Sequence, residues 1–298
     1  MMNKSTAGAQ ILTAEWVHTR FAPRQADSHK GTYGRLLTVC GKYGMAGAAL
    51  MCASAALRCG VGLLDAAVPR SVYPLIASAV PEAIFAPVAE TAAGGFSVAA
   101  TEGLRGRLLC ADAAVIGCGL GAEVDAATVV ERLLRERRCP AVLDADGINV
   151  ISPHILTEET VAFPLILTPH PGEMARLMQM PVGEVQAHRE ELASRFAEQY
   201  GVVTVLKGYR TVIAAPGQPL LVNPTGNPGM ATGGSGDVLA GMIGAFLAQG
   251  MDARDAAACG VYLHGAAGDL AAAKHSQHAM LPSDMIEELG SLFQNMEK

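Results

Sequence analysis

The chain has 298 residues, of which 50% are hydrophobic and only 5% aromatic, and its formal net charge is −6 at pH 7. This length suits one large α/β domain, and a core of Ala, Val, Leu, Ile and Met is typical of parallel sheets covered by helices. The acidic balance excludes a nucleic-acid scaffold, because neutralising phosphates requires clustered Lys and Arg.

Membrane insertion and export are also disfavoured by the sequence. No apolar run approaches the roughly 20 residues that span a bilayer, and the N-terminus lacks the apolar core of a secretory signal. The seven cysteines are scattered and never spaced C-x-x-C, which favours free thiols over disulfides or a zinc cluster. These features predict a cytoplasmic protein without a membrane partner.

The elements follow one another in an alternating order. The first 30 residues predict an N-terminal arm with a short helix at 13–20. After Gly34, apolar runs of strand length alternate with Ala-rich stretches of helical period, which indicates a mostly parallel central sheet flanked by helices on both faces. The predicted strands are 35–40, 63–68, 114–117, 141–144, 165–168 and 202–207, followed by an antiparallel pair, 211–215 and 220–222. The predicted helices are 46–58, 123–137, 184–200, 236–249, 253–273 and 283–295.

The loops that follow strands are the expected binding positions. Ligands of open α/β sheets bind beyond the carboxyl ends of the strands. Five loops meet this condition in the predicted order: 41–47, 117–121, 144–149, 168–173 and 207–211. No linker or repeat interrupts the chain, so a single domain over residues 1–298 is expected.

Residues 223–239 read N-P-T-G-N-P-G-M-A-T-G-G-S-G-D-V-L and run into an apolar helix. Backbone N–H groups around Gly236, at a helix N-terminus, can point together at a phosphate, and the helix dipole adds to this attraction. Asp237 would stand in the first turn, within reach of the group that reacts there. Alternatively, the glycines form a turn and Asp237 favours the helix start. The density of glycine favours a ligand site, because each glycine makes the loop harder to order.

Three further motifs follow strands. Residues 117–122 fit G-x-G-x-x-A with Asp144 ending the next strand, the fingerprint of a dinucleotide-dependent dehydrogenase, although such turns are common. His170 lies between two prolines on a stiff turn, and Glu173 falls in the first turn of the following helix. Lys207–Thr211 offers a cation and a hydroxyl at the binding edge, either as a nucleotide contact or as a solvated hairpin tip.

Several motifs together resemble one known family. They are H-K-G-T-Y-G from His29, G-x-x-x-M-A-G-A-A from Gly41, L-D-A-D-G from Leu143, L-T-P-H-P-G-E from Leu167, V-L-K-G from Val205 and the stretch from Asn223. In this order they resemble the ADP-dependent NAD(P)H-hydrate dehydratases. The resemblance implies a ribokinase-like α/β fold and the dehydration of the S-forms of NADH hydrate and NADPH hydrate to NADH and NADPH. ADP, possibly ATP, would be the co-substrate, with release of AMP and phosphate, and Mg²⁺ the cofactor.

The resemblance also assigns site residues. It implies that hydrate is bound at Ala48, Gly119, His170 and Asp237, with Asp237 as the catalytic group. It implies that AMP is bound at Lys207, Gly208, Tyr209, Arg210, Thr211 and Gly236, and that Mg²⁺ is linked to Glu173.

The resemblance further suggests a homotetramer and a functional link to a separate NAD(P)H-hydrate epimerase, since the chain leaves no room for an epimerase domain. Three alternatives stay open at this point. The first is a small-molecule kinase of the same fold, acting on a vitamin precursor such as hydroxymethylpyrimidine or pyridoxal. The second is an NAD-dependent dehydrogenase that uses residues 117–122, and the third is a nucleotide sensor without turnover.

Overall fold

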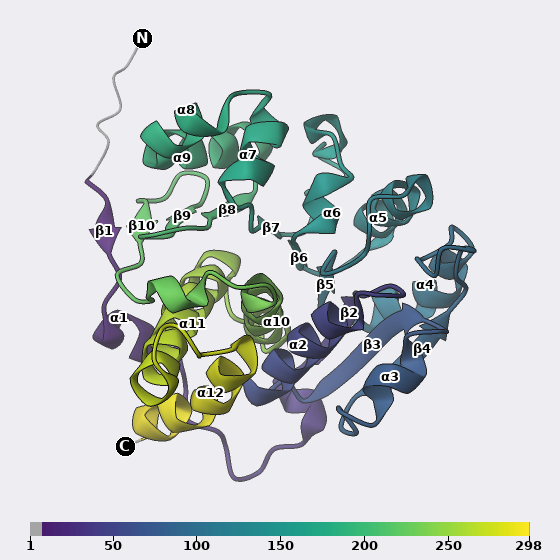
Figure 1. The fold of residues 1–298 in the computed structure, drawn as a ribbon, viewed down its shortest axis with the longest axis horizontal. Helices are drawn as coiled ribbons and strands as arrows, with labels where there is room; N and C mark the ends of the chain where they lie inside the picture. Colours follow the sequence, from purple (N-terminus) through teal and green to yellow (C-terminus); the bar gives the residue numbers. More distant parts are fainter. Residues whose placement is uncertain (1–7, 298) are drawn as a thin grey trace.

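The computed structural model describes residues 8–297, which contain one ten-stranded sheet (Figure 1). Its strands are β1 (Gln10–Ile11), β2 (Arg35–Val39), β3 (Leu63–Pro69), β4 (Ile84–Val88), β5 (Ala113–Ile116), β6 (Ala141–Leu143), β7 (Leu165–Leu167), β8 (Val203–Leu206), β9 (Val212–Ala214) and β10 (Leu221–Val222). Their order across the sheet is β1-β10-β9-β8-β7-β6-β5-β2-β3-β4. Only β9 runs antiparallel to its neighbours, so the sheet is mostly parallel, as expected.

Helices cover both faces of the sheet (Figure 1). They are α1 (Ala14–His18), α2 (Ala46–Arg58), α3 (Tyr73–Ala77), α4 (Ala100–Cys110), α5 (Val124–Glu136), α6 (Asp146–Asn149), α7 (Pro171–Met178), α8 (Val182–Ala187), α9 (Arg189–Tyr200), α10 (Ser235–Ala248), α11 (Ala253–His275) and α12 (Pro282–Met296), with 3-10 turns at Lys30–Tyr33, Pro153–Ile155 and Pro228–Met230. One core layer joins α2, α10, α11 and α12 to the sheet, and the other joins α4, α5, α7 and α9.

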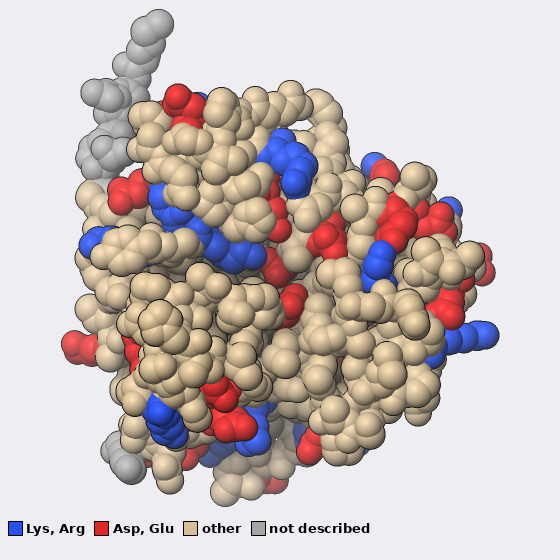
Figure 2. Space-filling view, viewed as in Figure 1, with Lys and Arg blue, Asp and Glu red and all other residues tan. Residues whose placement is uncertain are grey.

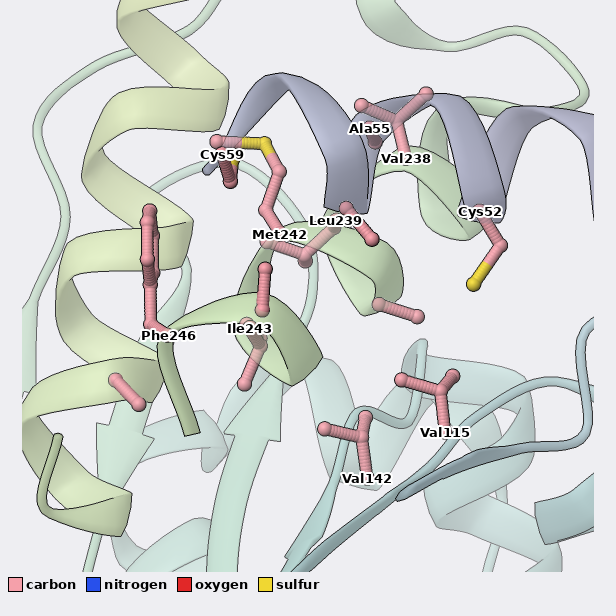
Figure 3. Close-up of a cluster of buried hydrophobic side chains, with 14 of the residues drawn as sticks. Cys52, Ala55, Cys59, Val115, Val142, Val238, Leu239, Met242, Ile243 and Phe246 are labelled. Atoms are coloured by element: carbon pink, nitrogen blue, oxygen red, sulfur yellow. The ribbon is translucent and has the colours of Figure 1, made fainter. Parts of the chain in front are cut away.

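Helix α10 packs against both α2 and the sheet, and small residues allow this close packing. A Cβ atom on Gly241 would overlap the backbone of Cys52 on α2, and one on Gly244 would overlap Val115 of β5. Figure 3 shows Met242 of α10 next to Cys59 at the end of α2, whereas Phe246 packs against Phe293 of α12. Almost every residue of α10 is buried, which explains why the helix is apolar on every side. Because the helix is packed along its whole length, its N-terminus is held in a fixed position at the sheet.

The structure departs from the sequence expectations in several elements, and three of these departures have a clear local cause. β4 was not predicted, because its run is short and contains Pro87, which an edge strand tolerates. Helix α4 was missed because Gly103 and Gly106 weaken its helical pattern. The predicted helix 184–200 is wrong as one element, since it divides at His188 into α8 and α9.

The predicted N-terminal arm is tied to the fold through β1, which pairs with β10, and through α1, which contacts α11. Its residues 1–7 lie outside the described part of the chain. The expectation of a single domain over 1–298 stays a prediction. Within residues 8–297, no helix is both long and apolar enough to cross a membrane.

The strand order fixes where a ligand can enter. From β2 the chain moves outward to β3 and β4, then returns to β5 on the other side of β2. The helices that follow β2 and β5, α2 and α5, belong to opposite core layers. Such a reversal opens a crevice at the carboxyl ends of the two strands.

Candidate active site

The loops after β2 and β5 meet at this crevice. The Gly41 N–H donates to the Cys118 carbonyl at 2.8 Å. Gly119 has a φ of +63°, and a Cβ there would lie 2.7 Å from the Cβ of Ala48 on α2. Ala48 and Gly119, two of the positions predicted to bind hydrate, are therefore in contact, and the glycine is required by this close approach.

A charged cluster lies beyond the ends of β6, β7 and β8. Asp144 is only 1% exposed, and its Oδ1 accepts from Lys207 Nζ at 2.7 Å and from Thr168 Oγ1 at 2.5 Å. Lys207 Nζ also lies 3.9 Å from Oε2 of Glu173. Because β6, β7 and β8 are neighbours in the sheet, residues 63 positions apart in the sequence form this ion pair.

The cluster shifts the pKa values of its members. Burial raises the pKa of Glu173 to about 7, although the charge on Lys207 opposes the shift. Burial lowers the pKa of Lys207, but Asp144 and Glu173 outweigh it, so that the net pKa is raised and the ammonium stays charged. Burial and the charge on Lys207 lower the pKa of His170. Shifts of this kind are concentrated at functional sites, although structural ion pairs also produce them.

His170 and Glu173 together form a capping box at the start of α7. His170 Nδ1 accepts from the N–H groups of Gly172 and Glu173 at 2.9 and 3.3 Å, and Oε2 of Glu173 accepts from the His170 N–H at 2.7 Å. The His170 side chain is 55% exposed. Its Nε2 lies 3.4 Å from Oε1 of Glu173, so the cap and this contact fix a ring that is still half open to solvent.

The glycine-rich stretch ends at the N-terminus of α10, as predicted. Gly234 is the N-cap residue with a φ of +99°, and the N–H groups of Gly236 and Asp237 have no acceptor among residues 8–297. A Cβ on Gly236 would lie 3.4 Å from Lys207 Nζ and 3.7 Å from Oδ2 of Asp144. The unpaired N–H groups and the Lys207 ammonium thus lie side by side, which is the chemistry of an anion site.

Asp237 completes this arrangement. A carboxylate oxygen of Asp237 lies within 4.8 Å of a carboxylate oxygen of Asp144 and of the Cys118 sulfur. Burial, followed by the charges of Asp144 and Cys40, raises the pKa of Asp237 to about 7, and a hydrogen bond from Cys118 and the charge of Lys207 oppose the rise. A carboxylate with this pKa is matched to proton transfer near neutral pH.

The loop after β8 carries the other predicted nucleotide positions. Gly208 packs against Arg189, which donates to the carbonyls of Leu206 and Lys207 at 2.8 and 3.1 Å. Tyr209 is 90% exposed, and Arg210 follows it with a φ of +55°. In the view of Figure 2, acidic atoms lie near the centre of the face with basic atoms beside them. The structure thus brings Lys207 and Gly236 together and leaves Tyr209 and Arg210 in solvent beside them.

Some residues of this site were not singled out by the sequence. Thr168 and Cys40 were not named individually, and Asp144 was considered as the end of a strand in the dehydrogenase fingerprint, whereas it is the buried partner of Lys207. The glycines of residues 117–122 have a packing explanation, because a Cβ on Gly117 would overlap the backbone at Asp144. The dehydrogenase fingerprint is therefore not needed to explain them.

Two surface pockets lie away from the cluster. One, of about 330 Å³, is formed by β4 and α4, and the other, of about 250 Å³, by α7 and α9. Within the described part of the chain, none of the predicted site residues lines either pocket. The candidate site is therefore defined by its side chains and unpaired N–H groups.

Comparison with known proteins finds one matching family model and several similar sequences. A family model described as NAD(P)H-hydrate dehydratase matches residues 36–290. The chain is 44% identical over 289 residues to a bifunctional NAD(P)H-hydrate repair enzyme of Moorella thermoacetica, covering 97% of this chain and 54% of that protein. It is 38% identical to an ADP-dependent (S)-NAD(P)H-hydrate dehydratase of Bacillus subtilis, covering 96% of this chain and 98% of the other. It therefore spans about half the length of the bifunctional relative.

Solved structures agree with this result. A crystal structure of ADP/ATP-dependent NAD(P)H-hydrate dehydratase from Bacillus subtilis, co-crystallised with ATP/Mg²⁺, has a TM-score of 0.85 at 35% identity, covering 97% of this chain and 99% of that one. A ribokinase-like superfamily protein of Enterococcus faecalis has a TM-score of 0.82 at 26% identity, covering 99% of each chain. The expected ribokinase-like fold is thereby confirmed.

Proposed function

This chain belongs to the NAD(P)H-hydrate dehydratase family, and we propose that it restores NADH and NADPH from the S-forms of their hydrates. ADP is the proposed co-substrate, and AMP and phosphate are the proposed products. The observation that carries the proposal is the position of Asp237, whose carboxylate adjoins unpaired backbone N–H groups and the Lys207–Asp144 pair. A base and an anion site are thus adjacent, as phosphoryl transfer to a hydroxyl requires.

In the proposed reaction, the Asp237 carboxylate takes the proton of the hydrate hydroxyl as that oxygen attacks the β-phosphorus of ADP. AMP leaves, and the N–H groups of Gly236 and Asp237, together with Lys207, stabilise the charge on the transferred group. The ring nitrogen's lone pair then expels phosphate from the phosphorylated hydrate. Loss of a proton from the adjacent ring carbon restores the dihydronicotinamide.

The remaining predicted positions have assigned parts in this proposal. Ala48 and Gly119 shape the hydrate pocket at the crevice, and their contact supports this assignment. The exposed ring edge of His170 approaches the hydrate from the opposite loop. The segment Gly208–Thr211 contacts the nucleotide, with Tyr209 free to lie against the base.

Mg²⁺ remains a proposed cofactor, with Glu173 as the residue linked to it. Carboxylate oxygens of Glu173 and Asp144 lie in one cluster around Lys207, and Mg²⁺ prefers oxygen donors of this kind. The donor set therefore fits, although Oε2 of Glu173 is also used by the helix cap. When bound, Mg²⁺ neutralises charge on the phosphates. The structural relative from Bacillus subtilis was crystallised with ATP/Mg²⁺, which supports a nucleotide with Mg²⁺ and leaves the choice between ADP and ATP to experiment.

We also propose a cytoplasmic location and cooperation with a separate NAD(P)H-hydrate epimerase. The seven free cysteines support a reducing compartment, and the bifunctional relatives carry the name of a combined hydrate-repair enzyme. The homotetramer expected from the family resemblance stays a prediction.

The decisive experiment compares the protein with its Asp237→Asn variant. Each is incubated with NADH hydrate, Mg²⁺ and either ADP or ATP, and the recovery of reduced-nicotinamide absorbance and the release of phosphate are followed. We expect kcat to fall by about 10²–10⁴ in the variant, because the base is lost, while the nucleotide Kd stays the same. Undiminished turnover would remove Asp237 from the mechanism. Phosphate retained on an organic product would indicate a kinase instead.

A further inference from the structure

Three cysteines converge beside the candidate active site. Cys40 directly follows β2, Cys52 lies on α2 and Cys118 lies in the loop after β5. Their sulfur atoms all lie within 4.8 Å of one another, and none of the three residues is more than 1% exposed. The scattered cysteines gave no such indication in the sequence, because the contact arises only when β2 and β5 pair and α2 packs over them.

The three cysteines adjoin the carboxylates of the candidate active site. The Cys118 sulfur belongs to both groups, since it also lies within 4.8 Å of carboxylate oxygens of Asp144 and Asp237. It donates to Oδ2 of Asp144 at 3.8 Å. Whatever the three sulfurs bind will therefore lie next to the proposed base.

Simple packing explains a single buried cysteine, which behaves as a small apolar residue. Cys59 and Cys259 fit that description, because burial is the main cause of their raised pKa values. Three sulfurs from separate segments that approach one another beside two carboxylates form a different environment. Thiolates are soft ligands that select Zn²⁺ or Cu⁺, whereas Mg²⁺ takes oxygen ligands.

The geometry suits a tetrahedral ion. With Zn–S bonds of about 2.3 Å, tetrahedral ligation places sulfur atoms about 3.8 Å apart, and small side-chain rotations reach this spacing from the observed limit of 4.8 Å. Water or the Asp237 carboxylate would take the fourth position.

We propose that Cys40, Cys52 and Cys118 form a binding site for a soft, thiophilic metal ion such as Zn²⁺, and that its occupation inhibits the enzyme. Binding releases the thiol protons, so the affinity rises with pH. The inhibition rests on the proposed function, because a cation beside Asp237 favours a metal-bound carboxylate that no longer accepts the hydroxyl proton. The binding itself does not depend on that function.

The binding test uses the full chain, stripped with a chelator and kept in a non-thiol reductant. Co²⁺, a spectroscopic substitute for Zn²⁺, should bind at one ion per chain. The bound ion should give sulfur-to-cobalt charge-transfer absorption, which Zn²⁺ abolishes. Cys52→Ala should weaken Co²⁺ binding by at least about tenfold. Cys59→Ala is the matched control, since Cys59 is buried on the same helix, and it should bind like the unmodified protein.

A measurement without substitutions keeps the proposal testable where a variant fails to fold. X-ray absorption of the Zn²⁺-loaded protein should show three sulfur neighbours at about 2.3 Å. A single sulfur neighbour would indicate binding at the exposed Cys110. Either this result or the absence of any sulfur neighbour would overturn the proposed three-cysteine site.

The inhibition is tested by turnover at buffered free Zn²⁺. Turnover should fall in the unmodified protein and in Cys59→Ala and recover with chelator, whereas Cys52→Ala should keep the same rate with and without Zn²⁺. A Zn²⁺ ion bound by three sulfur atoms without loss of turnover would overturn the proposal that the ion inhibits the enzyme. A chain with no dehydratase activity at all would refute the proposed function and leave the cobalt and absorption results standing.

Discussion

The raised pKa of Asp237 predicts that the proposed base destabilises the fold. Burial, with the charges of Asp144 and Cys40, raises this pKa from its usual 3.8 to about 7. The folded protein therefore holds the proton more tightly than the unfolded chain does. The fold bears no cost from Asp237 below pH 3.8, loses stability as the pH rises toward about 7, and carries the full cost above that value. Asp237→Asn removes this cost.

The magnitude follows from the size of the shift. Each pKa unit corresponds to about 1.4 kcal/mol, so the rise from 3.8 to about 7 corresponds to about 4 kcal/mol above neutral pH. Asp237 is partly exposed, and solvent screening reduces the value. We expect Asp237→Asn to be about 1–4 kcal/mol more stable than the unmodified protein at pH 8.

The assay is chemical denaturation at pH 5 and pH 8 without nucleotide, with stability obtained by linear extrapolation. The advantage of the variant should grow with pH. The pKa of Glu173 is also about 7, but Glu173 is present in both proteins and cancels from their difference. Glu102→Gln is the matched control, because Glu102 also lies in the first turn of a helix and is exposed. An advantage that does not change with pH, or a loss of stability at pH 8, would refute the reasoning.

Three further predictions concern the same cluster. Gly236→Ala should raise the nucleotide KM by about tenfold or more with the melting temperature unchanged or higher, because the added Cβ would lie 3.4 Å from Lys207 Nζ, where a phosphate must approach; steady-state kinetics check this, and an unaltered KM would move the anion site elsewhere. Lys207→Met should cost about 3–5 kcal/mol of unfolding free energy, since it removes the cation that pairs with the buried Asp144; urea titration measures it, and a loss below about 1 kcal/mol would mean that the pair does not stabilise the fold. In the unmodified enzyme, kcat/KM should rise with pH through about 7 as Asp237 loses its proton, whereas a flat profile there would exclude it as the base.

The sequence carried enough information for the central sheet and its helices. The apolar runs that became β2, β3 and β5–β8 were predicted within a residue or two of their ends, because buried parallel strands are continuously apolar. The helix at 46–58 was predicted at its observed bounds. β4 and α4 were not predicted, because Pro87 and the two glycines of α4 contradict local propensity and tertiary packing overrides them.

The site was less accessible to sequence reasoning. Glycine density marked the start of α10, and strand ends marked the loops at His170 and Lys207. Spacing alone could not show that Lys207 pairs with Asp144, because the pair depends on β7 lying between β6 and β8. The three converging thiols depend in the same way on the pairing of β2 with β5.

The edge strand β1 has a consequence for how the chain is made. Gln10 pairs with Leu221 of β10, so β1 leaves the ribosome long before the strand that it pairs with has been synthesised. Asn223, which opens the glycine-rich stretch, comes directly after that pairing. This edge of the sheet is therefore completed late, and a chain that lacks β1 would leave β10 as an uncovered edge that other polypeptides can join.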